Sequence, residues 1–188
     1  MIHHPSGTFP VLQTERLTLR QLLPGDAPGV FALRSDSDIN QYLDRAEAKT
    51  LDDAIHFIQR ITDAVNNNEA LYWAVALTES DTFAGTICLF GFSDQLEKCE
   101  TGFELLPGFQ GKGMMTEAAA RVVEYATQTL NVAVIEAFAH KENQKSIRLL
   151  HRLGFQLSTA LPNDVSDEND AAQILSLYIF APLHQRAT

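Results

Sequence analysis

The chain has 188 residues, of which 45% are hydrophobic and 20% are charged, proportions typical of a globular domain rather than a disordered or fibrous chain. Its formal net charge is −10, and Lys and Arg are scattered, so we expect neither a nucleic acid nor an anionic membrane surface as partner. No apolar run reaches membrane-spanning length, and the first ten residues lack the basic and apolar regions of a secretory signal. We therefore expect a cytoplasmic protein.

The first predicted elements are a strand and two helices. Residues 14–22 alternate polar and apolar side chains and predict a strand. A Pro-Gly-Asp break leads from it into a helix over 27–34. Residues 50–66 predict a second helix, because Thr50 is a favourable N-cap and two aspartates follow it in the first turn. Its expected apolar stripe consists of Ile55, Ile58, Ile61 and Val65.

The middle of the chain predicts an antiparallel meander. Strand-like runs at 71–78, 84–92 and 99–106 are separated by short polar turns. A glycine-rich turn at 107–113 then leads into a helix at about 114–129. The expected buried face of that helix carries Ala118, Val122, Ala126 and Leu130.

The remaining elements complete a mixed sheet. They are a buried strand at 132–138, a short helix at 143–152, strands at 155–160 and 173–181, and an acidic loop at 162–172. The order β-α-α-β-β-β-α-β-α-β-β predicts an α/β (α+β) fold, with a mixed, mostly antiparallel, seven-stranded sheet and helices on both faces. Because strands 99–106 and 132–138 flank a helix, we expect them to run parallel. We expect one domain over 1–188, with its core at about 14–181.

The most informative stretch is PGFQGKGMMTEA at residues 107–118, which joins a strand to a helix. Glycines let the backbone approach a ligand closely, and the free N–H groups and the dipole of a helix N-terminus attract anions. Lys112 adds a positive charge. We interpret the stretch as a pyrophosphate site, the alternative being a plain glycine turn. It is not a P-loop, because the Gly-Lys-Ser/Thr ending is missing.

This stretch resembles the acetyl-CoA loop of the GNAT superfamily of N-acetyltransferases. The family pattern Gln/Arg-x-x-Gly-x-Gly/Ala matches Gln110 and Gly113, and Met115 replaces the final small residue. Three further segments resemble the RimJ/RimL-like branch, which acetylates protein N-termini. They are TERLTLR at 14–20, YWAV with AGTI at 72–75 and 84–87, and ENQKSIRLL with LGF at 142–150 and 153–155. The resemblance implies transfer of acetyl from acetyl-CoA, as co-substrate, to an amine.

The resemblance also implies where acetyl-CoA binds. Two splayed strands of the sheet would receive the pantetheine arm like an additional strand, and the backbones of Leu105 and Leu106 would bond its amides. Asn143 would contact the cofactor near the pantetheine, although an N-cap of the helix at 144–152 is an equal and compatible role. The residues expected around the pyrophosphate are Gln110, Gly111, Lys112, Gly113, Met114, Met115 and Thr116.

The reaction needs a proton acceptor, because an alkylammonium is not a nucleophile. Glu100 and Glu104 lie on one face of the same predicted strand. Glu100 matches a glutamate that several GNAT enzymes use as general base, Glu104 is a second candidate, and a surface carboxylate is the alternative for Glu100. Leu150 stands where many members have a tyrosine acid. Ser146 is then the candidate to protonate or hydrogen-bond the leaving sulfur, unless its hydroxyl only bonds backbone.

The acceptor amine stays open at this point. A protein N-terminus, a small amine such as a polyamine, amino acid or antibiotic, and a CoA-binding module without catalysis are all compatible with the sequence. We expect the acceptor groove to be built from loops 36–50, 93–98 and 162–172. No His, Cys or carboxylate cluster has the spacing of metal ligands, so we expect no metal. A monomer and a homodimer are both compatible.

Overall fold

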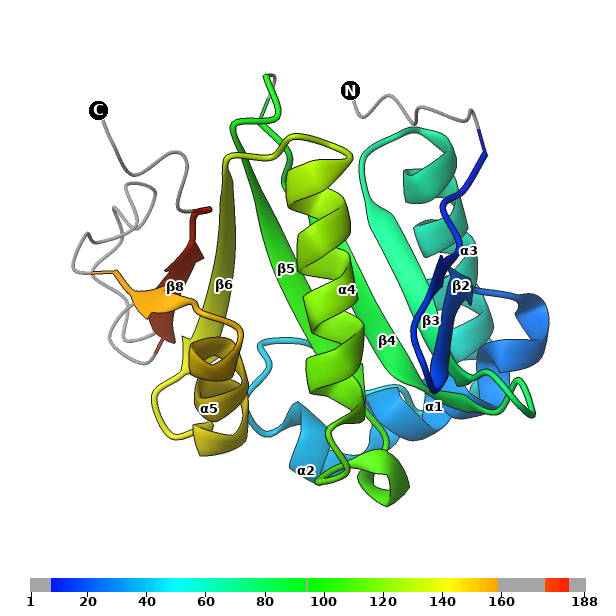
Figure 1. The fold of residues 1–188 in the computed structure, drawn as a ribbon. Coiled ribbons are helices and arrows are strands. Elements are labelled where there is room, and N and C mark those ends of the chain that lie inside the picture. Colours follow the sequence, from blue (N-terminus) through cyan, green and yellow to red (C-terminus); the bar gives the residue numbers. More distant parts are fainter. Residues whose placement is uncertain (1–7, 94, 159–174, 183–188) are drawn as a thin grey trace.

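A computed structural model of the chain describes residues 8–93, 95–158 and 175–182. They form a mixed eight-stranded sheet in the order β1-β2-β3-β4-β5-β6-β8-β7, with helices on both faces (Figure 1). The strands are β1 (Leu12–Gln13), β2 (Leu17–Gln21), β3 (Leu71–Leu77), β4 (Phe83–Phe90), β5 (Lys98–Leu105), β6 (Val134–His140), β7 (Gln156–Leu157) and β8 (Leu175–Phe180). The helices are α1 (Ala27–Ser35), α2 (Ser37–Asn40), α3 (Leu51–Asn66), α4 (Met114–Gln128) and α5 (Gln144–Arg152).

The fold class predicted from the sequence is confirmed, but the predicted count of seven strands is wrong by one. The additional strand is β1, which pairs antiparallel with β2 through Leu12 and Leu19. A strand of two residues is too short to show an alternating pattern, and the same reason hides the four-residue helix α2. The predicted acidic loop at 162–172 lies outside the described residues.

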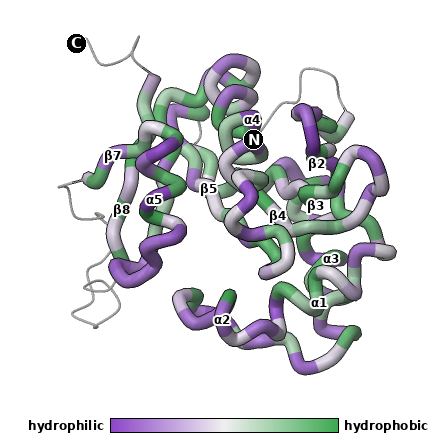
Figure 2. Tube along the Cα trace, turned by 60° about the horizontal axis from the view of Figure 1, so that its bottom comes forward, coloured by the Kyte–Doolittle hydropathy of each residue, from purple (hydrophilic) through white to green (hydrophobic). Residues whose placement is uncertain are grey.

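The side chains of β3 show how both faces of the sheet are covered. Trp73 and Val75 belong to a core cluster that includes the buried face of α4, whereas Tyr72 and Ala74 on the opposite face pack into a second cluster with α1 and α3. This is the period-two alternation of a strand buried on both sides. Figure 2 shows the hydrophobic residues gathered on the strands, while α2 and α5 are largely hydrophilic. The predicted buried residues of α4, namely Ala118, Val122, Ala126 and the following Leu130, are all buried.

Helix α3 begins as predicted and packs Ile58, Ile61 and Val65 of the predicted stripe inward, but it buries Ala54 in place of Ile55. Thr50 is its N-cap and forms a capping box with Asp53. Ile58 is buried, whereas Ile55, which the predicted stripe included, is 47% exposed and Ala54 is buried in its place. The helix therefore turns the i, i+4 pair of Ala54 and Ile58 toward the sheet, and Ile55 points about 100° away from that stripe.

The sheet opens between β5 and β6. These strands run parallel, as predicted, but pair only at Lys98–Val134, Cys99–Ile135 and Glu100–Glu136. Beyond these pairs β5 continues beside β4 and β6 continues beside β8, so the two strands diverge (Figure 1).

None of the helices in the described part of the chain combines the length and hydropathy that a membrane span requires.

Candidate active site at the open edge of the sheet

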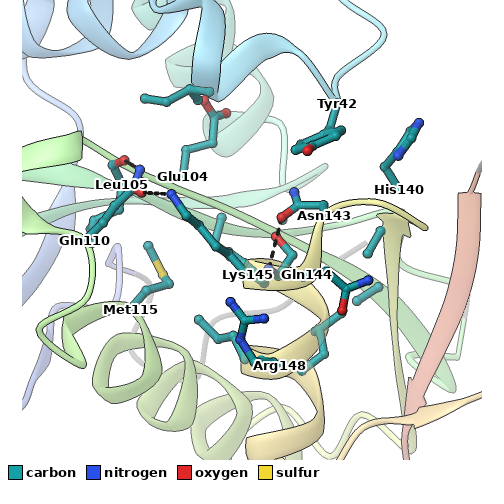
Figure 3. A pocket seen from close by; sticks show the side chains of 18 of the residues that line it. Tyr42, Glu104, Leu105, Gln110, Met115, His140, Asn143, Gln144, Lys145 and Arg148 are labelled. Carbon is teal, nitrogen blue, oxygen red and sulfur yellow. Dashed lines mark hydrogen bonds between the residues drawn. The ribbon is translucent and has the colours of Figure 1, made fainter.

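A cavity with a volume of about 1630 Å³ occupies the opening between β5 and β6. Its walls are the diverging ends of the two strands, the N-termini of α4 and α5, and the segment from α2 to Asp44 (Figure 3). The volume exceeds the roughly 300–1,000 Å³ of ordinary small-molecule sites. The cavity is therefore large enough for an extended ligand that contacts both strands and the N-termini of both helices.

The N-terminus of α4 presents unpaired backbone N–H groups to this cavity. Gly111 and Gly113 have φ of +75° and +77°, a left-handed conformation that favours glycine. The carbonyl of Gly113 accepts the first intrahelical bond, from Glu117. The N–H groups ahead of that bond, for which no described residue is an acceptor, are those of Met114, Met115 and Thr116. Since these residues line the cavity, the arrangement can bind an anion.

An ion pair behind the glycine loop holds it in this position. The carboxylate of Glu117 accepts bonds from the Thr14 hydroxyl (2.5 Å) and from the backbone N–H (3.0 Å) and Nε (2.7 Å) of Arg16. Arg16 Nη1 also donates to the Lys112 carbonyl at 3.1 Å. Although desolvation opposes the shift, the bonds from Thr14 and Arg16 hold the pKa of Glu117 below its ordinary value. The loop is thus held in place by the segment just ahead of β2.

Two side chains that the sequence assigns to the anion site are bonded within the protein. Lys112 Nζ donates to the Gly108 carbonyl at 2.7 Å, and Lys112 is not among the cavity-lining residues. Gln110 Nε2 donates to the Leu105 carbonyl at 2.8 Å, and its Oε1 accepts from Lys145 Nζ at 3.1 Å (Figure 3). Gln110 therefore braces the end of β5 against α5, and the loop offers its backbone to a ligand.

The strand β5 offers Leu105 rather than Leu106 to the cavity. The N–H of Leu106 donates to the Ala84 carbonyl, and the Leu106 carbonyl accepts from Phe109, both at 2.9 Å. Because hydrogen-bonded pairs alternate along an antiparallel ladder, the N–H and carbonyl groups of Phe103 and Leu105 point away from β4, toward the opening. Of the two residues expected to contact the pantetheine, only Leu105 has backbone groups on the open side.

The two candidate bases lie in different surroundings. Glu104 lines the cavity, and both of its carboxylate oxygens accept bonds from Arg45, each at 2.6 Å. Glu100 belongs to the last pair between β5 and β6, opposite Glu136, and is not among the cavity-lining residues. Burial, and after it repulsion by Glu136, raises the pKa of Glu100. The structure thus places Glu104 in an ion pair and Glu100 where the opening begins.

The start of α5 forms the wall opposite β5. Asn143 is the N-cap of the helix, and its Oδ1 accepts from the N–H of Ser146 at 3.1 Å. Both residues line the cavity, and the Ser146 hydroxyl bonds to none of the described residues. Leu150, at the position of the family tyrosine, is buried in the same wall. Ser146 therefore has a free hydroxyl on this wall, and Leu150 contributes only apolar surface.

A pair of rings that sequence reasoning missed lies at the edge of the cavity. The Tyr42 ring, after α2, packs against His140 at the end of β6 with centroids 5.0 Å apart (Figure 3). Of the loops expected to form the acceptor groove, 36–50 lines the cavity, whereas none of the described residues of 93–98 does. The sequence indicated Tyr42 only through the expectation that loop 36–50 lines the groove, and no sequence pattern links Tyr42 to His140.

Among the residues that the structure describes, no three His, Cys, Asp or Glu side chains are grouped to hold a metal ion.

Comparisons with known proteins identify the family of the chain. Residues 16–156 match the model of the acetyltransferase (GNAT) domain. The chain is 32% identical over 173 residues to an uncharacterized N-acetyltransferase, p20, of Bacillus licheniformis, a match that covers 92% of this chain and 95% of that protein.

Solved structures share the same fold. RimL, a ribosomal L7/L12 α-N-protein acetyltransferase in complex with coenzyme A, superimposes with a TM-score of 0.76 and 16% identity, covering 92% of this chain and 98% of that one. The spermidine N-acetyltransferase of Vibrio cholerae, in complex with CoA and spermine, gives a TM-score of 0.74 and 21% identity, with 89% and 96% covered. At these identities the likeness concerns the fold alone.

Proposed function

The chain belongs to the acetyltransferase (GNAT) family, and on that premise we propose that it transfers the acetyl group of acetyl-CoA directly to an amine. The observation that carries this proposal is the N-terminus of α4, where N–H groups of residues 114–116 lack acceptors among the described residues and face a large cavity. Such a helix end suits the diphosphate of coenzyme A. In RimL and the spermidine enzyme, the same fold holds coenzyme A.

The open edges of the sheet suit the pantetheine arm. Beyond Glu100 and Glu136 the strands β5 and β6 no longer pair with each other, so the N–H of Leu105 and the backbone groups of Phe103 are left for a ligand, while the Leu105 carbonyl accepts the bond from Gln110. An extended chain with two amides can bond to a free strand edge as a further strand does. Asn143 and Ser146 on the opposite wall would then lie along the arm, toward its sulfur.

Residues of the chain would accept and donate the protons and hydrogen bonds of the reaction. The acceptor ammonium first loses one proton, and Glu100 would take it through a water molecule, because Glu100 lies at the end of the opening rather than in the cavity wall. The amine nitrogen then bonds to the acetyl carbon, the carbon–sulfur bond breaks, and the second proton passes from the nitrogen to the departing thiolate, which becomes a thiol. The Ser146 hydroxyl would donate a hydrogen bond to that sulfur as it leaves. Glu104, held by Arg45, would position the segment around α2.

The proposed acceptor is a protein N-terminal α-amine, with a small amine as the second candidate. Asp38 and Asp44, on the side of the cavity next to α2, favour a cationic acceptor of either kind, whereas the basic lining residues Lys145, Arg148 and Arg152 belong to α5. An acetylation screen with peptides of varied N-terminal residue, alongside spermidine and free amino acids, tests the proposal. We expect turnover with at least one class. Tight binding of acetyl-CoA without acetylation of any amine would contradict catalysis and favour a CoA-binding module.

Replacing Ser146 with Ala is expected to lower kcat about tenfold, because one hydrogen bond to a charged leaving group is lost in the transition state. The affinity for acetyl-CoA should stay within about twofold. Steady-state kinetics and calorimetric titration measure the two quantities. Ser158→Ala is the matched control, since it removes a hydroxyl from a residue that is not among those lining the cavity. Full activity of the Ser146 variant would rule out a role for its hydroxyl.

A further inference from the structure

A second cavity, with a volume of about 300 Å³, lies on the face of the sheet that α1 and α3 cover. It shares five lining residues with the large cavity, namely Leu43, Asp44, Gly102, Phe103 and Glu104. Its other walls include Arg34 of α1 and Tyr72 of β3. The two cavities therefore adjoin each other along β5 and the segment after α2.

Arg34 is a half-buried cation in this cavity, and no carboxylate of the described residues forms an ion pair with it. Its guanidinium lies over the ring of Phe57, 4.0 Å from the centroid, and forms no hydrogen bond or ion pair with any residue in the described ranges. The nearby carboxylate of Glu104 does not neutralise it by contact, because Arg45 occupies both of its oxygens. Burial, and then repulsion by Arg45, lowers the pKa of Arg34, so an anion beside this guanidinium would be favoured.

Two hydroxyl groups lie in the otherwise mainly apolar lining of the second cavity. The Tyr72 hydroxyl donates to Thr86 Oγ1 at 3.2 Å, and both residues line the cavity with Arg34. A guanidinium whose N–H groups have no acceptor among the described residues can donate two parallel bonds to the oxygens of a carboxylate. The pocket therefore combines one guanidinium with two hydroxyl groups.

We propose that Arg34 anchors an acceptor subsite that binds a carboxylate carried by the amine substrate, an inference that rests on the proposed function. The acceptor would be an amine with a nearby acidic group, such as a peptide whose first or second residue is Asp or Glu, or an acidic amino acid. A polyamine, which carries only positive charges, would leave Arg34 unpaired. The subsite thus favours acceptors that carry a carboxylate, whether peptides or amino acids, over polyamines.

Kinetics with matched acceptors test the proposal. Peptides that differ only by Asp or Asn at position one or two, and the pair glutamate and glutamine, change a carboxylate into a carboxamide of similar shape. We expect KM for the acidic member of at least one pair to be lower by about tenfold or more. Arg34→Gln should abolish that difference and leave KM for acetyl-CoA unchanged. In Arg60→Gln the difference should persist, because exposed Arg60 contacts the same Phe57 ring from 5.9 Å but does not line the cavity.

The outcomes separate the subsite from the proposed function. Equal KM values within every pair, or a difference that survives in Arg34→Gln, would overturn the subsite while acetylation stands. If no amine is acetylated, the proposed function fails, but the subsite can still be tested. Propionate and propionamide are titrated separately into the protein, and the ¹⁵N amide resonances of Thr86 and Gly102 report binding. A saturable shift with propionate alone, lost in Arg34→Gln, supports it, and equal or absent shifts with both probes contradict it.

Discussion

A Gly113→Glu variant is expected to bind acetyl-CoA about a hundredfold more weakly or worse, while the protein still folds. Gly113 has φ of +77°, which costs a residue with a side chain on the order of 1 kcal/mol or more. An added Cβ would begin 3.7 Å from Arg16 Nη2, so the new carboxylate would compete for the cation that supports the Lys112 carbonyl. It would also bring a negative charge to the N–H groups proposed to hold the diphosphate.

Calorimetric titration with acetyl-CoA measures the effect, and circular dichroism verifies the fold. Gly108→Glu is the matched control, because it adds the same charge to the same loop. Gly108 has an ordinary φ, nothing within 4 Å of an added Cβ, and no place in the cavity wall. The control should bind within a few-fold of the native protein. Normal binding by the Gly113 variant would refute the assignment of the diphosphate to this helix end.

Glu100→Gln is expected to lower kcat by about a hundredfold, the low end of what a general base contributes. In the proposed mechanism the ionised form of Glu100 is the active one, and burial followed by the charge of Glu136 raises its pKa. The native rate should therefore rise with pH as Glu100 ionises, above the usual range for glutamate, and the variant should lack this rise. Because a raised pKa means that ionised Glu100 destabilises the fold at neutral pH, the variant should be at least as stable as the native protein.

Glu136→Gln provides the control for Glu100, since it removes the same charge from the paired position on β6. It should keep most of the activity. With one repulsive charge gone, the pKa of Glu100 should fall, and the rise in rate should begin at lower pH. Profiles of kcat against pH for the three proteins decide between the roles, and an unchanged profile in Glu100→Gln would exclude it as the base.

The parts of the fold that the sequence predicts are those with long periodic patterns. The three-strand meander and the buried face of α4 follow from repeats of two or about 3.6 residues. The parallel direction of β6 follows from the helix that separates it from β5. The elements that it misses, β1 and α2, have two and four residues and complete no such repeat. The exposed Ile55 has another cause: helical spacing gives several possible apolar stripes, and packing against the sheet selects the one through Ala54.

The residues of the candidate site also fall into two groups: those that a local sequence motif predicts and those that only the folded chain brings together. A glycine loop before a helix is a local motif, so the sequence indicates the exposed N–H groups of α4. The bonds from Gln110 to Lys145 and from Glu104 to Arg45 join residues 35 and 59 positions apart, and only the folded chain reveals them. For that reason the strand register suggests Glu104 as a candidate base, whereas the folded chain shows it in an ion pair with Arg45. Arg34 was missed because a lone arginine at a helix end carries no sequence signal of its own.

Three residue pairs are the direct backbone link between β5 and β6, so the sheet consists of two halves that share a short seam. A molecule laid along both free edges becomes part of the fold and stabilises it by mass action, by about 2.7 kcal/mol at a free concentration 100 times its Kd. The melting temperature of this protein would then report how much acetyl-CoA or coenzyme A surrounds it. Starving a cell of that pool would weaken the enzyme's architecture together with its activity.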